Sequence, residues 1–260
     1  MDFGYSIAGF IVGFIVGMTG VGGGSLMTPI LVLVFSIKPA IAVGTDLLYA
    51  SITKSGGILV HNRKGSIHWR IVGLLSLGSL PASLLSIYLL QYLGRTGINY
   101  DRLITTSLSI ALIMTSLVLL FKDRIQKLGQ NERFDVIRTL HKQLQTPITV
   151  LAGIVLGVLV TLSSIGAGAL GAAILFFLYP RLPTIKIVGT DLAHAVPLTA
   201  VAGLGHMHLG TIDFNMLAFL LLGSLPGIYI GSHIATRLPE QFVRPALASM
   251  LFLIGVRLAV

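Results

Sequence analysis

Val43-Gly-Thr-Asp-Leu47 occurs twice in this chain, the second time as Val188-Gly-Thr-Asp-Leu192, 145 residues later. The same shift pairs Gly78-Ser-Leu-Pro81 with Gly223-Ser-Leu-Pro226. Upstream, a shift of 144 residues pairs four glycines of the first half with four of the second, namely Gly9, Gly13, Gly22 and Gly24 with Gly153, Gly157, Gly166 and Gly168. Identities of five and four residues in register indicate a duplicated fold.

The sequence around these tracts is strongly apolar: 54% of the 260 residues are hydrophobic and 10% are charged. Soluble domains carry about 25% charged residues. Because hydrophobic runs recur from Phe3 to Val260, a soluble protein with one anchor is excluded. The net charge of +9 does not indicate nucleic-acid binding, since the basic residues lie in short loops. We therefore expect an all-α protein in a lipid bilayer, with no nucleic-acid partner.

Eight apolar segments follow one another, four in each half. We expect a first repeat over residues 1–121, a linker over 122–146 and a second repeat over 147–260. The first and fifth segments are too long for one crossing of about 20 residues and are interrupted by glycines. The segments are 5–37, 40–60, 69–90 and 103–121 in the first repeat, and 147–178, 185–205, 214–234 and 245–260 in the second.

The distribution of basic residues predicts how the two repeats are oriented. If the long first segment of each repeat crossed the membrane once, the repeats would be parallel and the loops would carry nine basic residues on one face and seven on the other. If that segment instead folds into a broken, re-entrant hairpin of two half-helices, three helices per repeat cross and the second repeat is inverted. Thirteen basic residues then share one face, against four (Lys38, Arg95, Arg102 and Arg257). The positive-inside rule favours inversion. It places the Lys122–Thr146 linker in the cytoplasm and both termini outside the cell.

The glycine-rich stretch Gly17–Ser25 breaks the first long segment. It lacks the lysine of a phosphate-binding loop and the third glycine of a dinucleotide loop. Gly9, Gly13 and Gly17 have the four-residue spacing of close helix packing. The denser Gly20–Gly24 predicts a helix break, which is tolerated inside a membrane only where protein or a cavity satisfies the backbone. The following half-helix would direct its amides at a small anion, while packing alone is the alternative.

Three motifs together resemble the TauE/SafE family of sulfite and organosulfur anion exporters. They are Gly13-x-x-x-Gly17-x-x-Gly20-x-Gly22-Gly-Gly24-x-x-x-x-Pro29, Val43-Gly-Thr45 and His61-x-Arg63-x-Gly65, with their equivalents in the second half. The resemblance covers almost the whole chain. It implies a multi-pass transporter in the plasma membrane, and a small sulfur-containing anion such as sulfite or a short sulfonate as substrate. The absence of cysteine excludes thiol chemistry as the route, and a homodimer remains an open alternative to a monomer.

We expect the substrate to lie at the midplane, between the two helix breaks. The first half would contribute Gly22, Gly23, Gly24, Ser25 and Thr45, and the second half Gly166, Gly168 and Thr190. The threonine hydroxyls have two interpretations: they donate to an anion oxygen, as the resemblance implies, or they cap helices.

Charged residues inside the apolar segments are costly and usually functional. Asp46 and Asp191 either cap helices that face water, become protonated and couple transport to protons, or bind a cation. Lys54 is a counter-ion for the substrate, a salt-bridge partner of Asp46, or a residue beyond the end of its helix. His194 and the His206-Met-His208 stretch are either hydrogen-bonded at helix interfaces or part of a proton relay.

Two other classes of function remain as alternatives. Asp46 and Asp191 would also suit a cation or proton transporter. An intramembrane serine hydrolase would need His194 beside Ser25 or Ser55, but no Gly-x-Ser-x-Gly motif surrounds either serine. We therefore expect a transporter with no catalytic residues, no metal site and no cofactor.

Overall fold

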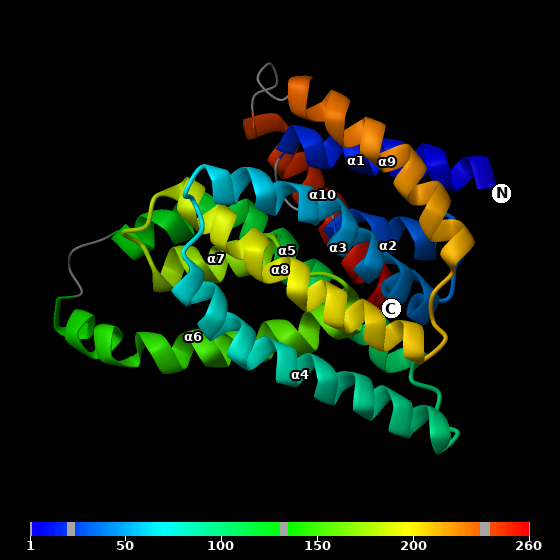
Figure 1. Cartoon of the computed structure of the whole chain (residues 1–260), viewed down its shortest axis with the longest axis horizontal. Helices are drawn as coiled ribbons and strands as arrows, with labels where there is room; N and C mark the ends of the chain where they lie inside the picture. The colour runs from blue at the N-terminus through cyan, green and yellow to red at the C-terminus, as the bar shows by residue number, and fades with distance from the viewer. Residues whose placement is uncertain (1, 20–23, 131–134, 235–239, 260) are drawn as a thin grey trace.

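The computed structural model describes residues 2–19, 24–130, 135–234 and 240–259. All regular secondary structure in this part of the chain is helical, which confirms the predicted all-α class. Figure 1 shows the helices, which are α1 (Asp2–Thr19), α2 (Gly24–Leu33), α3 (Pro39–Arg63), α4 (Trp69–Arg95), α5 (Asp101–Gln130), α6 (Asp135–Ser163), α7 (Ala169–Leu178), α8 (Thr184–His208), α9 (Phe214–Ile234) and α10 (Glu240–Ala259).

Five of the described helices contain stretches that are long and apolar enough to cross a membrane. These stretches are Trp69–Arg95, Asp101–Phe121, Leu144–Ser163, Thr184–His208 and Phe214–His233. Helix α3 is as long as α8 but carries Asp46 and Lys54 in its interior, which lowers its hydropathy. Such a bundle, with large apolar side chains exposed along its helices, is an all-α membrane protein.

The two halves of the chain are interleaved, and their contacts repeat when the halves are exchanged. Helix α1 packs along α9, and its counterpart α6 packs along α4, so each half places its first helix on the other half. Figure 1 shows these two pairs at opposite edges of the bundle. Helices α3 and α8, which are each other's counterparts, also pack together, as do α5 and α10. This exchange is what a two-fold relation between duplicated halves produces. That its axis lies in the membrane plane stays a prediction.

Glycines bring the exchanged helices close together. A Cβ atom on Gly9 or Gly13 would overlap the backbone of α9 at Leu220 or Ser224. In the second half, a Cβ atom on Gly153 or Gly157 would overlap the backbone of α4 at the equivalent residues Leu75 and Ser79. Gly17 meets the backbone of α9 in the same way, at Ile228. The predicted packing role of Gly9, Gly13 and Gly17 is thereby confirmed.

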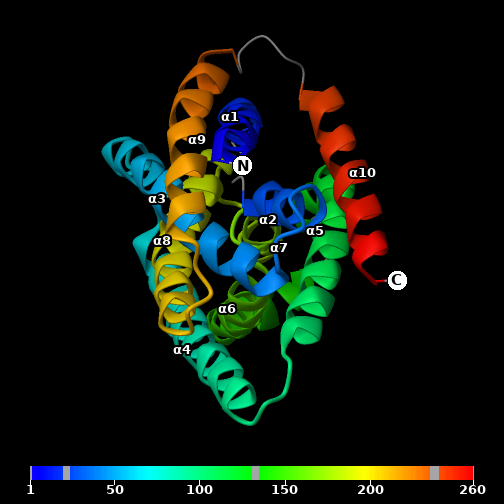
Figure 2. The ribbon, with the colours of Figure 1, turned by 90° about the vertical axis from the view of Figure 1, so that its right-hand side faces the viewer.

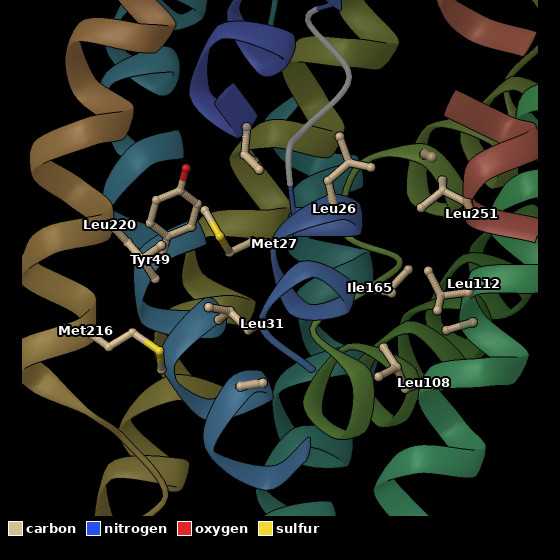
Figure 3. Packing of buried hydrophobic residues seen from close by; sticks show 14 of the residues in the cluster. Leu26, Met27, Leu31, Tyr49, Leu108, Leu112, Ile165, Met216, Leu220 and Leu251 are labelled. Carbon is tan, nitrogen blue, oxygen red and sulfur yellow. The ribbon is translucent and has the colours of Figure 1, made fainter. Parts of the chain in front are cut away.

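The structure places two helices in each long apolar segment, and the two are unequal in length. Helix α1 has 18 residues and α2 has 10, while α6 has 29 and α7 has 10. Figure 2 shows the short helices α2 and α7 in the middle of the bundle, between the longer helices. Met27 and Leu31 of α2 are fully buried there, and Figure 3 shows them near Tyr49 of α3 and Ile165 of the second break.

The linker expected over residues 122–146 is largely helical. Helix α5 continues to Gln130, and α6 begins at Asp135. Both helices therefore extend beyond their apolar parts into the polar middle of the chain.

Candidate functional site

The second helix break is a buried segment of unusual backbone. Residues 163–167 are all buried, and the φ angles are 58° at Ser164, 120° at Gly166 and 139° at Gly168. Glycine adopts such angles without the steric cost of a side chain, which explains Gly166 and Gly168. The break ends where α7 begins, and the first amides of a helix have no intrahelical acceptor. They create a partial positive charge in the protein interior.

The break predicted in the first half falls in a gap between the described residues, at positions 20–23. Gly22 and Gly23 belong to that gap, so their predicted role has no structural counterpart here. The gap is bounded by Thr19, where α1 ends, and Gly24, where α2 begins, and Ser25 follows in the first turn of α2. Gly24 and Ser25 thus stand at the N-terminus of a short central helix, as Ala169 does in the second half.

Lys54 connects the first half to the second break. It lies well inside α3, which excludes the interpretation that it follows the end of its helix. Only 7% of its surface is exposed, and its ammonium donates a 2.7 Å hydrogen bond to the Ala167 carbonyl. A hydrogen bond from a charged donor is stronger than a neutral one. The contact brings a positive charge next to the N-terminal end of α7.

The two aspartates of the repeated motif face the two short helices. Asp46 is fully buried, and its Oδ2 accepts a 2.5 Å hydrogen bond from Thr28 of α2. Asp191 is 4% exposed and lies against Gly171 of α7, where a Cβ atom would overlap its Oδ1. Both carboxylates interact electrostatically with Lys54. Oδ1 of each has no hydrogen-bond partner in the described structure.

A histidine and a tyrosine occupy equivalent positions beside these aspartates. His194 lies three residues after Asp191, and its Nε2 shares a 2.8 Å hydrogen bond with Ser79 Oγ. Its counterpart 145 residues earlier is Tyr49, whose buried hydroxyl lies near Ser224, the counterpart of Ser79. His194 Nδ1 and the Tyr49 hydroxyl lack partners among the described residues. Tyr49 was missed from the sequence, although aligning the two repeats would have paired it with His194.

Three further groups complete the site and were also not predicted. Thr28 holds Asp46, the Ala167 carbonyl accepts from Lys54, and Ser164 lies beside the Asp46 carboxylate. Ser164 corresponds to Gly20 under the 144-residue shift. The buried centre is therefore asymmetric, and it contains one lysine, two aspartates and several hydroxyl groups.

The hydroxyls of Thr45 and Thr190 contact the starts of helices in the opposite half. The Asp213 amide, just before α9, donates a 3.1 Å hydrogen bond to Thr45 Oγ1. In the equivalent contact, the His68 amide just before α4 donates to Thr190 Oγ1 at 2.9 Å. A hydroxyl that accepts one bond still has its own proton to donate. These contacts tie the halves together, while donation to a substrate by either threonine stays a prediction.

Replacing Thr45 or Thr190 with valine is expected to destabilise the protein. Each change leaves one amide without its acceptor, which costs about 1–3 kcal/mol. For a chain of this size we expect the Tm to fall by about 2–4 °C per kcal/mol, measured by thermal unfolding of the purified protein. Thr106→Val, at an exposed position of α5, is the matched control. An unchanged Tm in both variants would show that these bonds contribute nothing.

Two other histidines near helix ends, His206 and His61, have structural partners. His206 is buried, with Nδ1 bonded to Thr211 Oγ1 at 2.8 Å and Nε2 to the Thr161 carbonyl at 3.0 Å. The equivalent His61 bonds Ser66 at 2.8 Å. The interpretation of His206 as a hydrogen-bonded interfacial histidine is thereby confirmed.

The structure argues against one of the two serine–histidine pairs that the hydrolase alternative would need, the pair of Ser55 with His194. Ser55 is exposed and donates to the Ser51 carbonyl of its own helix, at 2.7 Å, and His194 bonds Ser79 instead. Within the described residues, no group of three metal-binding side chains occurs.

The chain is similar to known proteins over nearly its whole length. A family model described as "Sulfite exporter TauE/SafE" matches residues 5–258. The probable membrane transporter protein YjnA of Bacillus subtilis is 38% identical over 255 residues, which are 97% of each chain. YdhB of the same organism, also named a probable membrane transporter protein, is 27% identical over 94% of this chain and 97% of its own. The probable membrane transporter protein MJ0441 of Methanocaldococcus jannaschii is 26% identical over 96% and 92%, respectively. No solved structure matches the chain significantly.

The family match, the names of the relatives and the helices long and apolar enough to span a membrane describe the same kind of molecule, a multi-pass membrane transporter. The chain belongs to the TauE/SafE family.

Proposed function

We propose that the protein exports a small sulfur-containing anion, such as sulfite or a short organosulfonate. The observation that carries this proposal is the buried Lys54 ammonium, which bonds the backbone at the second helix break. A lysine charge and the N-terminus of α7 attract an anion to the same place. The family description supplies the substrate class.

The substrate would lie between the two breaks, near the middle of the bundle. Its oxygens would accept from the amides at Gly22–Ser25 in the first half, and at Gly166 and Gly168 in the second. Lys54 would supply the countercharge, and Thr45 and Thr190 would donate from the flanking helices. The rocking of one repeat against the other would then open the site to each side in turn.

Proton coupling follows from the charges at the centre. An anion close to two ionised carboxylates would be repelled, because like charges in a poorly solvated site repel each other with little screening. Binding is therefore favoured when one of the acidic groups is protonated. Asp46, Asp191 and His194 are the candidates for carrying that proton. We place the transporter in the plasma membrane, with the 122–146 linker in the cytoplasm and both termini outside.

The first test is a ligand screen of the purified protein by thermal unfolding. Sulfite or methanesulfonate is expected to raise the Tm, and an equal concentration of sodium chloride is not. A ligand at 100 times its Kd stabilises the folded state by about 2.7 kcal/mol. The same measurement with sulfate and thiosulfate tests whether the site selects an anion by its charge or by its shape. No stabilisation by any sulfur anion would contradict the proposal.

One observation favours a second candidate function, a cation or proton transporter. Asp46 and Asp191 each have a carboxylate oxygen without a partner, as a cation site requires. The two candidates differ in their driving gradient. Uptake into proteoliposomes that follows a cation gradient, with no response to sulfite, would favour this alternative.

A further inference from the structure

We propose that the two equivalent aspartates have different roles, and that Asp191 carries the coupling proton while Asp46 is a fixed structural carboxylate. This inference rests on the proposed transport of an anion. The repeated Val-Gly-Thr-Asp-Leu motif gives both aspartates the same sequence context. Their surroundings in the folded protein differ, as the contacts of each carboxylate show.

Asp46 is held by a hydroxyl group of the short helix α2. Thr28 donates to its Oδ2 at 2.5 Å, and Ser164 of the second break lies beside the same carboxylate. Hydrogen bonds donated to a carboxylate stabilise its ionised form. Since α2 is a short central helix, the Thr28 bond also fixes α2 against α3.

Asp191 lacks this support because the residue equivalent to Thr28 carries no hydroxyl group. The residue equivalent to Thr28 is Ala172, and the residue of α7 in contact with Asp191 is Gly171. No hydrogen bond to the Asp191 side chain occurs in the described part of the chain, and its Oδ1 is buried without a partner. The ionised carboxylate is balanced by Lys54, the charged group that acts on it electrostatically.

The elements packed around Asp191 offer no other charge to replace Lys54. Helix α7 has no ionisable residue, and neither does the 146–163 part of α6. On α4 the ionisable side chains Arg70, Tyr88, Tyr92 and Arg95 are all exposed. Helix α3 contributes the buried Lys54, Asp46 and Tyr49, and α8 itself contributes the buried His194. The other ionisable residues of these two helices, His61, Arg63, Lys186, His206 and His208, lie in their first or last turns.

Lys54 is consequently shared between Asp191 and the arriving anion. When the anion pairs with the Lys54 ammonium, the negative charge of the Asp191 carboxylate is no longer compensated. Protonation of the carboxylate then neutralises that charge. A proton on His194 would instead add a second cation beside Lys54. Each cycle thus binds one anion at Lys54 and one proton at an Asp191 oxygen, and it releases both on the other side. The anion and the proton move across the membrane in the same direction. The sum of their two gradients determines which direction that is.

The test uses methanesulfonate, which stays ionised across the physiological pH range, so that it carries no proton of its own. Proteoliposomes containing the purified full-length protein and an internal pH dye receive labelled methanesulfonate. We expect one proton to enter with each anion in the wild type. Asp191→Asn should reduce that ratio to zero while exchange of labelled for unlabelled anion persists. Asp46→Asn should lower the rate and keep the ratio at one.

A hydroxyl swap tests the same assignment without removing either aspartate. Ala172→Thr gives Asp191 the donor that Thr28 gives Asp46, which stabilises the ionised carboxylate. The pH of half-maximal transport, measured with labelled methanesulfonate, should move down by about one unit relative to wild type. Thr28→Ala, the matched control in the first half, should leave that pH unchanged and lower the Tm.

The results separate this inference from the function on which it rests. Methanesulfonate or sulfite transport without proton movement in the wild type would overturn the inference and leave the proposed function intact. A proton-to-anion ratio of zero in Asp46→Asn, together with a ratio of one in Asp191→Asn, would overturn the assignment of roles. If Asp191→Asn does not fold, an unchanged pH of half-maximal transport in Ala172→Thr would overturn the assignment of roles instead. The absence of any sulfur-anion binding or transport would refute the proposed function and this inference with it.

Discussion

Lys54→Met is expected to lower the rate of sulfite transport at least about tenfold. The substitution keeps an unbranched side chain of similar length and removes the ammonium that bonds Ala167 at the helix break. A hydrogen bond to a charged group contributes about 1.5–3 kcal/mol, and 1.4 kcal/mol is a factor of ten in an equilibrium constant. The measurement is uptake of labelled sulfite into proteoliposomes, normalised to the amount of folded protein.

Two controls separate loss of binding from loss of folding. Lys186→Met removes an exposed lysine near the start of α8 and should leave transport unchanged. Lys54→Met alone leaves buried carboxylates without their countercharge, which is destabilising. The double variant with Asp191→Asn removes one charge of each sign, so it should recover stability but not sulfite transport. Recovery of both would mean that Lys54 serves folding and not the anion.

The duplication made much of the fold predictable. A shared shift of 145 residues links Thr45 to Thr190, and in the structure each accepts a bond from the other half at equivalent positions. The glycines at four-residue spacing indicated close packing, and the structure shows their partners on α9 and α4. The partner helices could not be predicted from spacing alone, since close approach depends on two surfaces that are distant in the sequence.

The site was predictable in its residue types and less so in its contacts. Lys54, Asp46 and Asp191 were singled out because charge inside an apolar segment is costly, and the structure brings them into one electrostatic cluster. The acceptor of Lys54 is a backbone carbonyl, which every residue possesses, so no side-chain pattern could mark Ala167. The direction of Thr45 was also hidden, because adjacent helical residues point about 100° apart.

Gly78→Ala is expected to be the most destabilising of the single glycine substitutions on α4. A Cβ atom at Gly78 would overlap the Val150 carbonyl oxygen and would lie 2.8 Å from the Ile154 amide nitrogen. Both are backbone atoms of α6, so relief requires the two helices to separate. Overpacking of this kind costs about 1–3 kcal/mol, and at about 2–4 °C per kcal/mol it should lower the Tm by several degrees.

The same helix provides the control. At Gly73 a Cβ atom would meet nothing within 4 Å, so Gly73→Ala should keep or slightly raise the Tm, since alanine favours helix by up to about 1 kcal/mol. The duplicated fold adds a second expectation, because Gly223 meets the Ser6 backbone of α1 as Gly78 meets Val150. Gly223→Ala should therefore produce a similar loss. Equal Tm values for Gly73→Ala and Gly78→Ala would contradict the close approach of α4 and α6, whereas a loss at Gly78 alone would contradict the equivalence of the two halves.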